Sequence, residues 1–174
     1  MNPFRSVGAM LSLALVVVVA LALALVYAVV VPSLRNRLVD AKLNQLRGSL
    51  PAITTDVSQT PYQFWGLNKQ GWASGANARV VLYANANPAA TGDNVSLSVY
   101  DDSNTLTSVD VASDRVAERA AKSLAEASGT VVRGDNQFAE VAKRVDVPIP
   151  TGGIVVLLSA SLDDALANVR TVQQ

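Results

Sequence analysis

The stretch VVVPSLRNRLVDAKLNQL, residues 29–46, joins a long apolar run to a charged segment without a linker. Apolar residues recur in the charged segment at the i, i+4, i+7 and i+11 spacing of one helix face. They are Val39, Leu43, Leu46 and Leu50. We therefore expect a stiff helix over residues 32–50, with Gly48 and Pro51 as the signals that end it.

The apolar run before this helix covers residues 7–31 and contains no charged side chain. As a helix rising about 1.5 Å per residue, it reaches roughly 37 Å, against a bilayer core of about 30 Å. It is about twice as long as the apolar region of a signal peptide, and its end, YAVVVPS, offers no small-residue cleavage site. The run predicts an uncleaved transmembrane anchor that follows a short tail, residues 1–6.

The two flanks of this run differ in basic charge. Arg5 and the terminal amine precede the run, whereas four basic side chains follow it, opposed only by Asp40. The four are Arg35, Arg37, Lys42 and Arg47. By the positive-inside rule alone, the domain after residue 32 would lie in the cytoplasm.

The stripe at Val39, Leu43 and Leu46 has two interpretations. It can pack on the chain's own domain, or it can continue the membrane helix as the seam of a homodimer. A single stripe does not distinguish the two.

Residues 51–77 look irregular because they contain several prolines and glycines. They also contain four of the nine aromatic residues, namely Tyr62, Phe64, Trp65 and Trp72. Four exposed rings in so short a segment would form a sticky patch. We favour a lid on the core, with a ligand-binding wall as the alternative.

The remainder of the chain has the period-two apolar pattern and the turn residues of an antiparallel sheet. The expected strands are RVVLYA (79–84), VSLSVY (95–100), LTSVDV (106–111), TVV with FAEVAKRVDV about the turn RGDN (133–136), and IVVLLS (154–159). The turn DDSN (101–104) would join the second and third of these into a hairpin. The last strand is apolar throughout, which is typical of the centre of a sheet.

Two further helices are expected. The first starts at Ser113 or Asp114 as the N-cap and ends near Gly129. Its apolar face consists of Val116, Ala117, Ala120, Ala121 and Leu124. The second covers residues 162–174, where Ser161 and Asp164 have the spacing of a capping box.

Few types of chemistry remain open to this sequence. It has no cysteine and no histidine, and its formal net charge is zero, so it has neither a thiol site nor the basic surface that nucleic acid would require. GWASG (71–75) has its serine one place too late for a nucleophile elbow. The acid pairs Asp101/Asp102 and Asp163/Asp164 lack calcium-loop spacing. We therefore predict no catalytic residue, no metal ligand and no cofactor, and the chain is not expected to be an enzyme.

The sequence does not identify ligand-binding residues. Arg79, Tyr83, Tyr100 and Arg133 are polar-tipped residues on or beside expected strands. Exposed strand positions have the same pattern, so the sequence assigns them no role.

The phrases PSLRNRLVDAKL, FAEVAKRVDVP and VVLLSASLDDALANVRTVQ resemble the input half of actinobacterial sensor histidine kinases. The resemblance implies an α+β fold, in which the transmembrane helix is followed by a PAS-like or Cache-like antiparallel sheet with flanking helices. It places an extracytoplasmic sensor domain at residues 51–161 and implies that helix 162–174 leads to a second membrane span absent from this sequence. On this ground we expect the domain after residue 32 to lie outside the cytoplasm, against the count of basic residues.

The function implied by this resemblance is sensory input to a two-component histidine kinase, with the signal passing through the terminal helices. The phosphoacceptor and ATPase regions are not in this sequence. The expected partners are the lipid bilayer, a second copy of the chain and a small-molecule ligand of unknown identity. The alternative is a single-pass anchored protein that binds or assembles components of the cell envelope without signalling.

Overall fold

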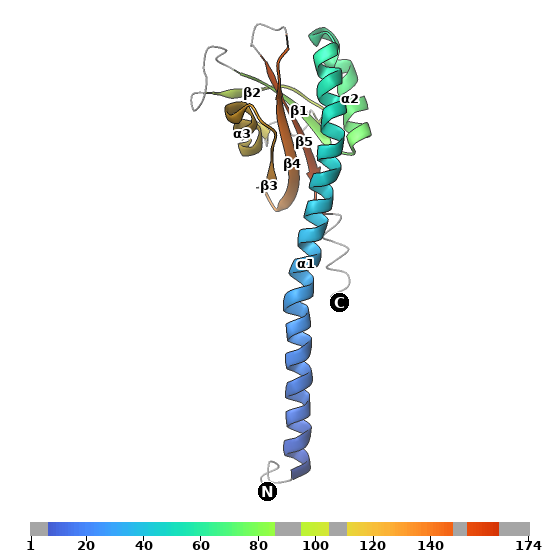
Figure 1. Cartoon of the computed structure of the whole chain (residues 1–174), viewed down its shortest axis with the longest axis vertical. Coiled ribbons are helices and arrows are strands. Elements are labelled where there is room, and N and C mark those ends of the chain that lie inside the picture. The colour runs from blue at the N-terminus through green and yellow to red at the C-terminus, as the bar shows by residue number, and fades with distance from the viewer. Residues whose placement is uncertain (1–6, 86–94, 105–110, 148–152, 164–174) are drawn as a thin grey trace.

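The computed structural model of the chain describes residues 7–85, 95–104, 111–147 and 153–163. A single long helix, α1, opens the chain and extends far beyond the domain that follows it (Figure 1). The helices are α1 (Val7–Gln59), the 3-10 turn η2 (Tyr62–Phe64), α2 (Trp65–Ala76) and α3 (Arg115–Ser123). The strands are β1 (Arg79–Asn85), β2 (Leu97–Asp102), β3 (Ala127–Arg133), β4 (Asn136–Val145) and β5 (Ile154–Ser161).

The five strands form one sheet in the order β2-β1-β5-β4-β3, and each neighbouring pair is antiparallel. The α+β class expected from the sequence is therefore confirmed. β5 lies at the centre of the sheet and is buried over all but its last residue, as its unbroken apolar sequence predicted. The turn RGDN also lies where it was expected, between β3 and β4, with Gly134 at a φ of 58°.

One expected hairpin differs from the structure. The return strand after DDSN falls mostly at residues 106–110, which lie outside the described residues. Asp101 and Asp102 are not turn residues, because they end β2 and remain paired with β1. The ion pairs that these carboxylates make with Lys69 and Arg79 hold them on the strand.

Helices cover both faces of the sheet. α1 and α2 lie on one face and α3 lies on the other (Figure 1). The alternation of strand residues divides the core accordingly, so that Val80 and Leu82 pack towards α1 and α2 while Val81 and Tyr83 pack towards α3. The sheet is thus the middle of three layers.

The stripe on α1 packs on the chain's own sheet. Leu46 and Leu50 are fully buried and Leu43 is 9% exposed, all in the cluster that includes Val156 and Leu158 of β5. The interpretation of these leucines as a dimer seam was therefore wrong, since the domain itself covers them.

The predicted end of the first helix was also wrong. α1 continues through Gly48 and Pro51 to Gln59. Ile53 and Val57 are buried on the far side of Pro51, so packing offsets the cost of a proline inside the helix. Pro51 itself is exposed, which lets water reach the Arg47 carbonyl that its missing N–H leaves unpaired.

Residues 51–77 are therefore helical for most of their length. Trp65 and Trp72 are buried under α1, and Trp65 Nε1 donates a hydrogen bond to the Thr60 carbonyl at 2.9 Å. Tyr62 and Phe64 are 54% and 46% exposed. The core-lid interpretation thus holds for the two tryptophans only.

α3 begins as predicted and ends earlier. Asp114 Oδ1 accepts hydrogen bonds from the backbone N–H groups of Val116 and Ala117 at 2.8 and 2.9 Å. Leu124 is 66% exposed and ends the helix with a φ of 57°, so it does not belong to the apolar face. Gly129, the predicted stop, lies inside β3.

Among the described residues, only α1 is long and apolar enough to cross a membrane. Its most apolar 18-residue window has a mean hydropathy of 3.1, and none of that window is buried. The expected C-terminal helix lies almost entirely at residues 164–174, which are outside the described residues.

Candidate functional site

A row of polar side chains crosses the sheet face that α3 covers. In the strand register, Arg79 is opposite Ser159, Ser159 is opposite Glu140, and Glu140 is opposite Gly129. Residues opposite each other in antiparallel strands project to the same face. The register therefore places charged and hydroxyl groups from β1, β5 and β4 under α3.

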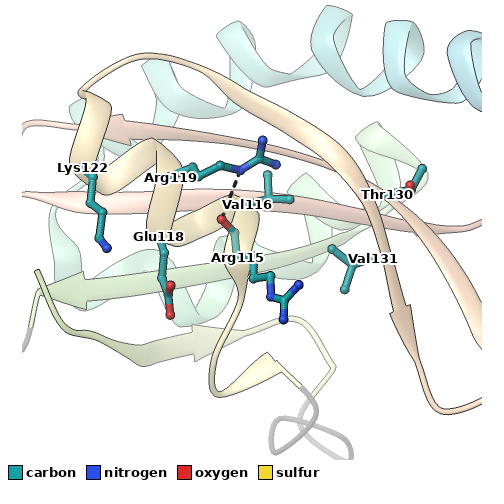
Figure 2. Close-up of a pocket in the computed structure, with 7 residues that line it drawn as sticks. All are labelled: Arg115, Val116, Glu118, Arg119, Lys122, Thr130 and Val131. Carbon is teal, nitrogen blue, oxygen red and sulfur yellow. Dashed lines mark hydrogen bonds between the residues drawn. The ribbon is translucent and has the colours of Figure 1, made fainter. Parts of the chain in front are cut away.

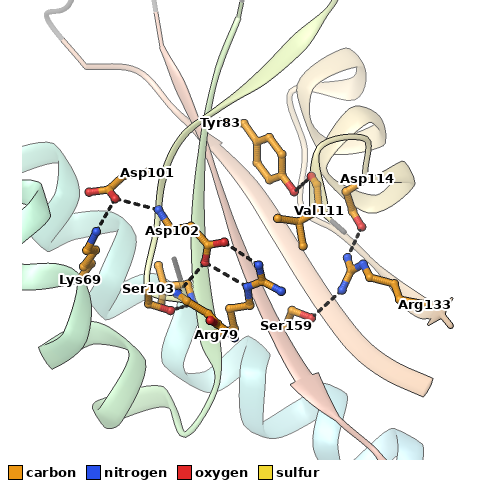
Figure 3. Close-up of polar contacts among 12 residues, drawn as sticks. Lys69, Arg79, Tyr83, Asp101, Asp102, Ser103, Val111, Asp114, Arg133 and Ser159 are labelled. Carbon is orange, nitrogen blue, oxygen red and sulfur yellow. Dashed lines mark hydrogen bonds and ion pairs between the residues drawn. The ribbon is translucent and has the colours of Figure 1, made fainter. Parts of the chain in front are cut away.

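Four side chains of this region form a connected group, which we call the charge cluster: Asp114, Arg133, Glu140 and Ser159. Arg133 Nη2 lies 2.6 Å from Asp114 Oδ2 and 2.5 Å from Glu140 Oε1. Ser159 Oγ accepts a hydrogen bond from Arg133 Nη1 at 3.2 Å and donates one to Glu140 Oε1 at 2.7 Å. Figure 3 shows Arg133 between Asp114 and Ser159.

The charge cluster contains two carboxyl groups and one guanidinium, and all three are buried. Their side chains are 1% (Asp114), 0% (Glu140) and 8% (Arg133) exposed. Glu140 Oε2 has no hydrogen-bond partner among the described residues. With both acids ionised, the single guanidinium balances only one of the two buried negative charges, so the ionisation of Glu140 is opposed.

The pKa of Glu140 reflects this environment. Burial, followed by the charge of Asp114, raises the pKa of Glu140 to about 7, although Arg133 and Ser159 act in the opposite direction. Burial also raises the pKa of Tyr83, whose hydroxyl donates to the Val111 carbonyl at 2.7 Å. Tyr83 is therefore a neutral donor on the same sheet face as a carboxyl group that titrates near neutral pH.

Arg79 and Asp102 form a second ion pair on the same face. Arg79 Nη2 lies 2.5 Å from Asp102 Oδ2, and Arg79 Nε donates to Asp102 Oδ1 at 3.0 Å. This pair is balanced in charge and ties β1 to the end of β2. Arg79 is therefore already paired with the carboxylate of Asp102.

A basic groove lies between α3 and β3, beside the charge cluster (Figure 2). It has a volume of about 440 Å³ and adjoins a second hollow of about 680 Å³. Both are lined by Arg115, Thr130 and Val131. The first adds Glu118, Arg119 and Lys122, and the second adds Arg133.

This α3–β3 groove has more basic than acidic side chains, so it favours an anionic ligand over a cationic one. Arg119 is partly committed, because its Nη2 donates to the Ser128 carbonyl at 3.1 Å. Among the residues that the structure describes, Arg115 has no carboxylate partner. The buried guanidinium of Arg133 thus separates a surface groove from an acidic interior.

The four polar residues singled out in the sequence divide between the two faces. Arg79, Tyr83 and Arg133 lie on the α3 face, whereas Tyr100 packs edge-on against Trp65 with 5.6 Å between the ring centroids. The acid pair Asp101/Asp102 is split, since Asp101 binds Lys69 at 2.6 Å and Asp102 binds Arg79. Asp163 accepts from Ser161 Oγ at 2.9 Å, and Asp164 is not among the described residues.

Sequence reasoning missed Glu140 and Ser159, and it assigned Asp114 only its capping role. One signal was present, a glutamate inside the strand sequence FAEVA, whose neighbours Ala139 and Val141 both pack in the core on the α1 face of the sheet. Within the described ranges, no group of three or more acidic side chains is arranged to hold a metal ion.

No protein-family model matches the chain, and no curated protein matches it by sequence. Among solved structures, it is similar to the sensory domain of the Campylobacter jejuni chemoreceptor Tlp3 (CcmL) with isoleucine bound, at 14% identity and a TM-score of 0.44 over 81% of this chain and 63% of that one. The ligand-binding domain of Tlp3 with L-norvaline gives 13% identity and a TM-score of 0.45 over 94% and 64%. The chain thus spans less than two thirds of the length of these domains.

Proposed function

We propose that this chain is the membrane-anchored sensory input module of a two-component sensor histidine kinase, with the domain after residue 32 outside the cytoplasm. In this proposal, residues 162–174 lead towards a second membrane span, and the transmitter lies outside residues 1–174. The observation that carries the proposal is α1, one helix from Val7 to Gln59.

The two halves of α1 have different surroundings. Its first half is apolar and exposed, as a lipid-facing helix is, whereas Leu46, Leu50 and Val57 in its second half are fully buried against the sheet. A helix that is packed into a domain at one end and spans a bilayer at the other transmits a shift or rotation that a flexible tether would absorb. The α3–β3 groove and the charge cluster supply places where a stimulus acts on the domain.

The phase of α1 provides the test. Residues 1–174 are joined to the transmitter of a sensor kinase through that kinase's own second span, and one to four alanines are inserted between Ser33 and Leu34. Each insertion turns the domain by about 100° relative to the span, so four bring it back to within about 40°. We expect autokinase activity to vary with the number of insertions and to approach the parent level again at four.

A control series places the same alanines between Leu124 and Ala125, in the exposed connection between α3 and β3, where they do not alter the phase of α1. This series should leave the activity of the fusion unchanged. Autokinase activity that does not change with the number of alanines in α1 would contradict the proposal. It would favour the alternative, an anchored envelope protein without a signalling role.

A further inference from the structure

We propose that the charge cluster is a proton-binding site in which Glu140 takes up one proton and thereby controls how Asp114 holds the start of α3. The proton's role as a stimulus rests on the proposed sensory function, whereas its uptake and its effect on α3 do not.

The first support is the convergence of two carboxylates on one nitrogen. Asp114 Oδ2 and Glu140 Oε1 lie 2.6 and 2.5 Å from the same atom, Arg133 Nη2. With both acids ionised, the cluster has one negative charge in excess among side chains that are at most 8% exposed. Two carboxylates that share a site favour a state in which only one of them is ionised.

The second support is the unpaired oxygen. Glu140 Oε2 is buried without a hydrogen-bond partner among the described residues. A proton on Glu140 removes the charge of this carboxyl group and turns it into a hydrogen-bond donor. One proton therefore neutralises the excess charge of the cluster.

The neighbouring elements on this face also present charged and titratable groups, and each of these groups already has a bonding partner. β1 presents Tyr83 and Arg79, which bind the Val111 carbonyl and Asp102 respectively. β5 presents Ser159, which binds Glu140 itself. α3 presents Arg119, which lies over Gly129 and donates to the Ser128 carbonyl.

A proton also fits the available space better than a larger cation. Glu140 is fully buried, and it lines neither hollow of the α3–β3 groove. Its protonation is a simple exchange with solvent, in which the carboxyl group releases a proton to water as the pH rises and recovers it as the pH falls.

Asp114 connects this exchange to α3. Its Oδ1 caps the helix at Val116 and Ala117, while its Oδ2 is bound to Arg133. When Glu140 loses its proton, the two carboxylates repel each other and compete for Arg133. This repulsion acts on Asp114, which caps the first turn of α3 beside the α3–β3 groove.

Infrared difference spectra of the full chain in detergent, recorded between about pH 6 and about pH 8, test the proton uptake. Few carboxyl groups titrate in this range, so we expect one protonated-carboxyl band that is lost as the pH rises. Glu140→Gln should remove the band, and Glu118→Gln, a partly exposed glutamate on the outer side of α3, should leave it in place. A spectrum without the band, or a band that persists in Glu140→Gln, would overturn the proposal.

Amide hydrogen exchange at Val116 and Ala117 tests the link to α3. After division by the intrinsic rates at each pH, exchange in the parent chain should be several-fold faster at about pH 8 than at about pH 6. Glu140→Gln should show no such change. Equal protection at both pH values in the parent chain would refute control of α3, even with the infrared band present.

The kinase fusion separates this inference from the proposed function. If the fusion responds to insertions in α1 and its activity changes between about pH 6 and about pH 8 only when Glu140 is present, the proton is a stimulus. A fusion that responds to the insertions and ignores pH would overturn the role of the proton as a stimulus and leave the sensory function standing.

Discussion

Arg133 on β3 and Glu140 on β4 form an ion pair that runs diagonally across a hairpin, with Arg133 Nη2 2.5 Å from Glu140 Oε1. In the strand register, Arg133 is opposite Asn136 and Glu140 is opposite Gly129, so the arginine must reach along the sheet. Its side chain passes over Phe138, with Cζ 5.3 Å from the ring centroid. Buried pairs of this kind are sensitive to the loss of either partner.

The free energy of unfolding should depend on the ionisation of Glu140. The pKa of Glu140 is raised from 4.5 to about 7 in the folded chain, so between these pH values the folded state holds a proton that the unfolded state has lost. Stability should therefore fall as the pH rises from about 4.5 to about 7, by about 3 kcal/mol, and change little above that. Denaturant titrations of the full chain in detergent at a series of pH values measure this slope.

The matched variants sharpen the pH prediction. Glu140→Gln should flatten the slope in this window and unfold at higher denaturant concentration than the parent at about pH 8. Glu118→Gln should keep the parent slope. An unchanged slope in Glu140→Gln would show that another group is responsible.

Arg133→Met should destabilise the chain by about 3 to 5 kcal/mol at neutral pH, because it leaves two buried carboxyl groups without their cation. Combining it with Glu140→Gln should recover part of this loss, since only one buried charge then remains. Arg115→Met, an exposed change on α3, should cost less than about 0.5 kcal/mol. Equal losses in the single and the double variant would mean that Arg133 acts only through packing.

Asp114 should contribute in two separable ways. Asp114→Asn keeps an oxygen that can cap α3 and removes the charge, so the pKa of Glu140 should fall and its infrared titration should move to lower pH. Asp114→Ala also removes the cap and should cost about 1 kcal/mol more than Asp114→Asn. A Glu140 titration that does not move in Asp114→Asn would contradict the coupling between the two carboxyl groups.

Local patterns predicted most of the elements of this fold, because strand alternation and capping chemistry act over a few residues. The β3–β4 turn, the central strand β5 and the cap at Asp114 all lie where the sequence places them. The end of α1 does not, because Gly48 and Pro51 are local stop signals that the burial of Ile53 and Val57 overrides.

The charge cluster has a different origin. Arg133, Glu140 and Ser159 come from three strands whose register brings them together, and Asp114 joins them from the N-cap of α3. Arg133 looked like a turn residue beside Gly134, and Ser159 looked like the end of an apolar strand. A shift of one residue in the β4–β5 register would move Glu140 away from Ser159 and to the other face, which no local pattern reveals.

Leu43→Asp should destabilise the domain, because Leu43 packs against the sheet and is only 9% exposed. Placing a charge in this position should cost several kcal/mol and lower the melting temperature of the full chain by several degrees or more. Asn44→Asp, on the exposed side of the same turn of α1, is the matched control and should melt like the parent. A Leu43→Asp chain that melts normally and loses crosslinking in membranes would restore the dimer-seam interpretation.

The last prediction concerns topology, where the count of basic residues and the family resemblance disagree. The structure gives three of the four basic residues after the apolar run a use within the domain. Arg35 donates to Gln137 Oε1 at 2.7 Å, Lys42 donates to the Asn77 carbonyl at 3.5 Å, and Arg47 lies 3.3 Å from Glu126. These contacts provide a reason for basic residues at this flank that does not depend on the cytoplasm.

We therefore expect a phosphatase fused after Gln174 to be active and a fluorescent protein at the same place to stay dark, as an extracytoplasmic domain requires. Replacing Arg35 and Arg37 with glutamine should leave this pattern unchanged or strengthen it, because it removes the charge that opposes translocation. A dark phosphatase with a bright fluorescent fusion would show that the positive-inside rule decides the orientation. In that case the pH that reaches Glu140 would be that of the cytoplasm.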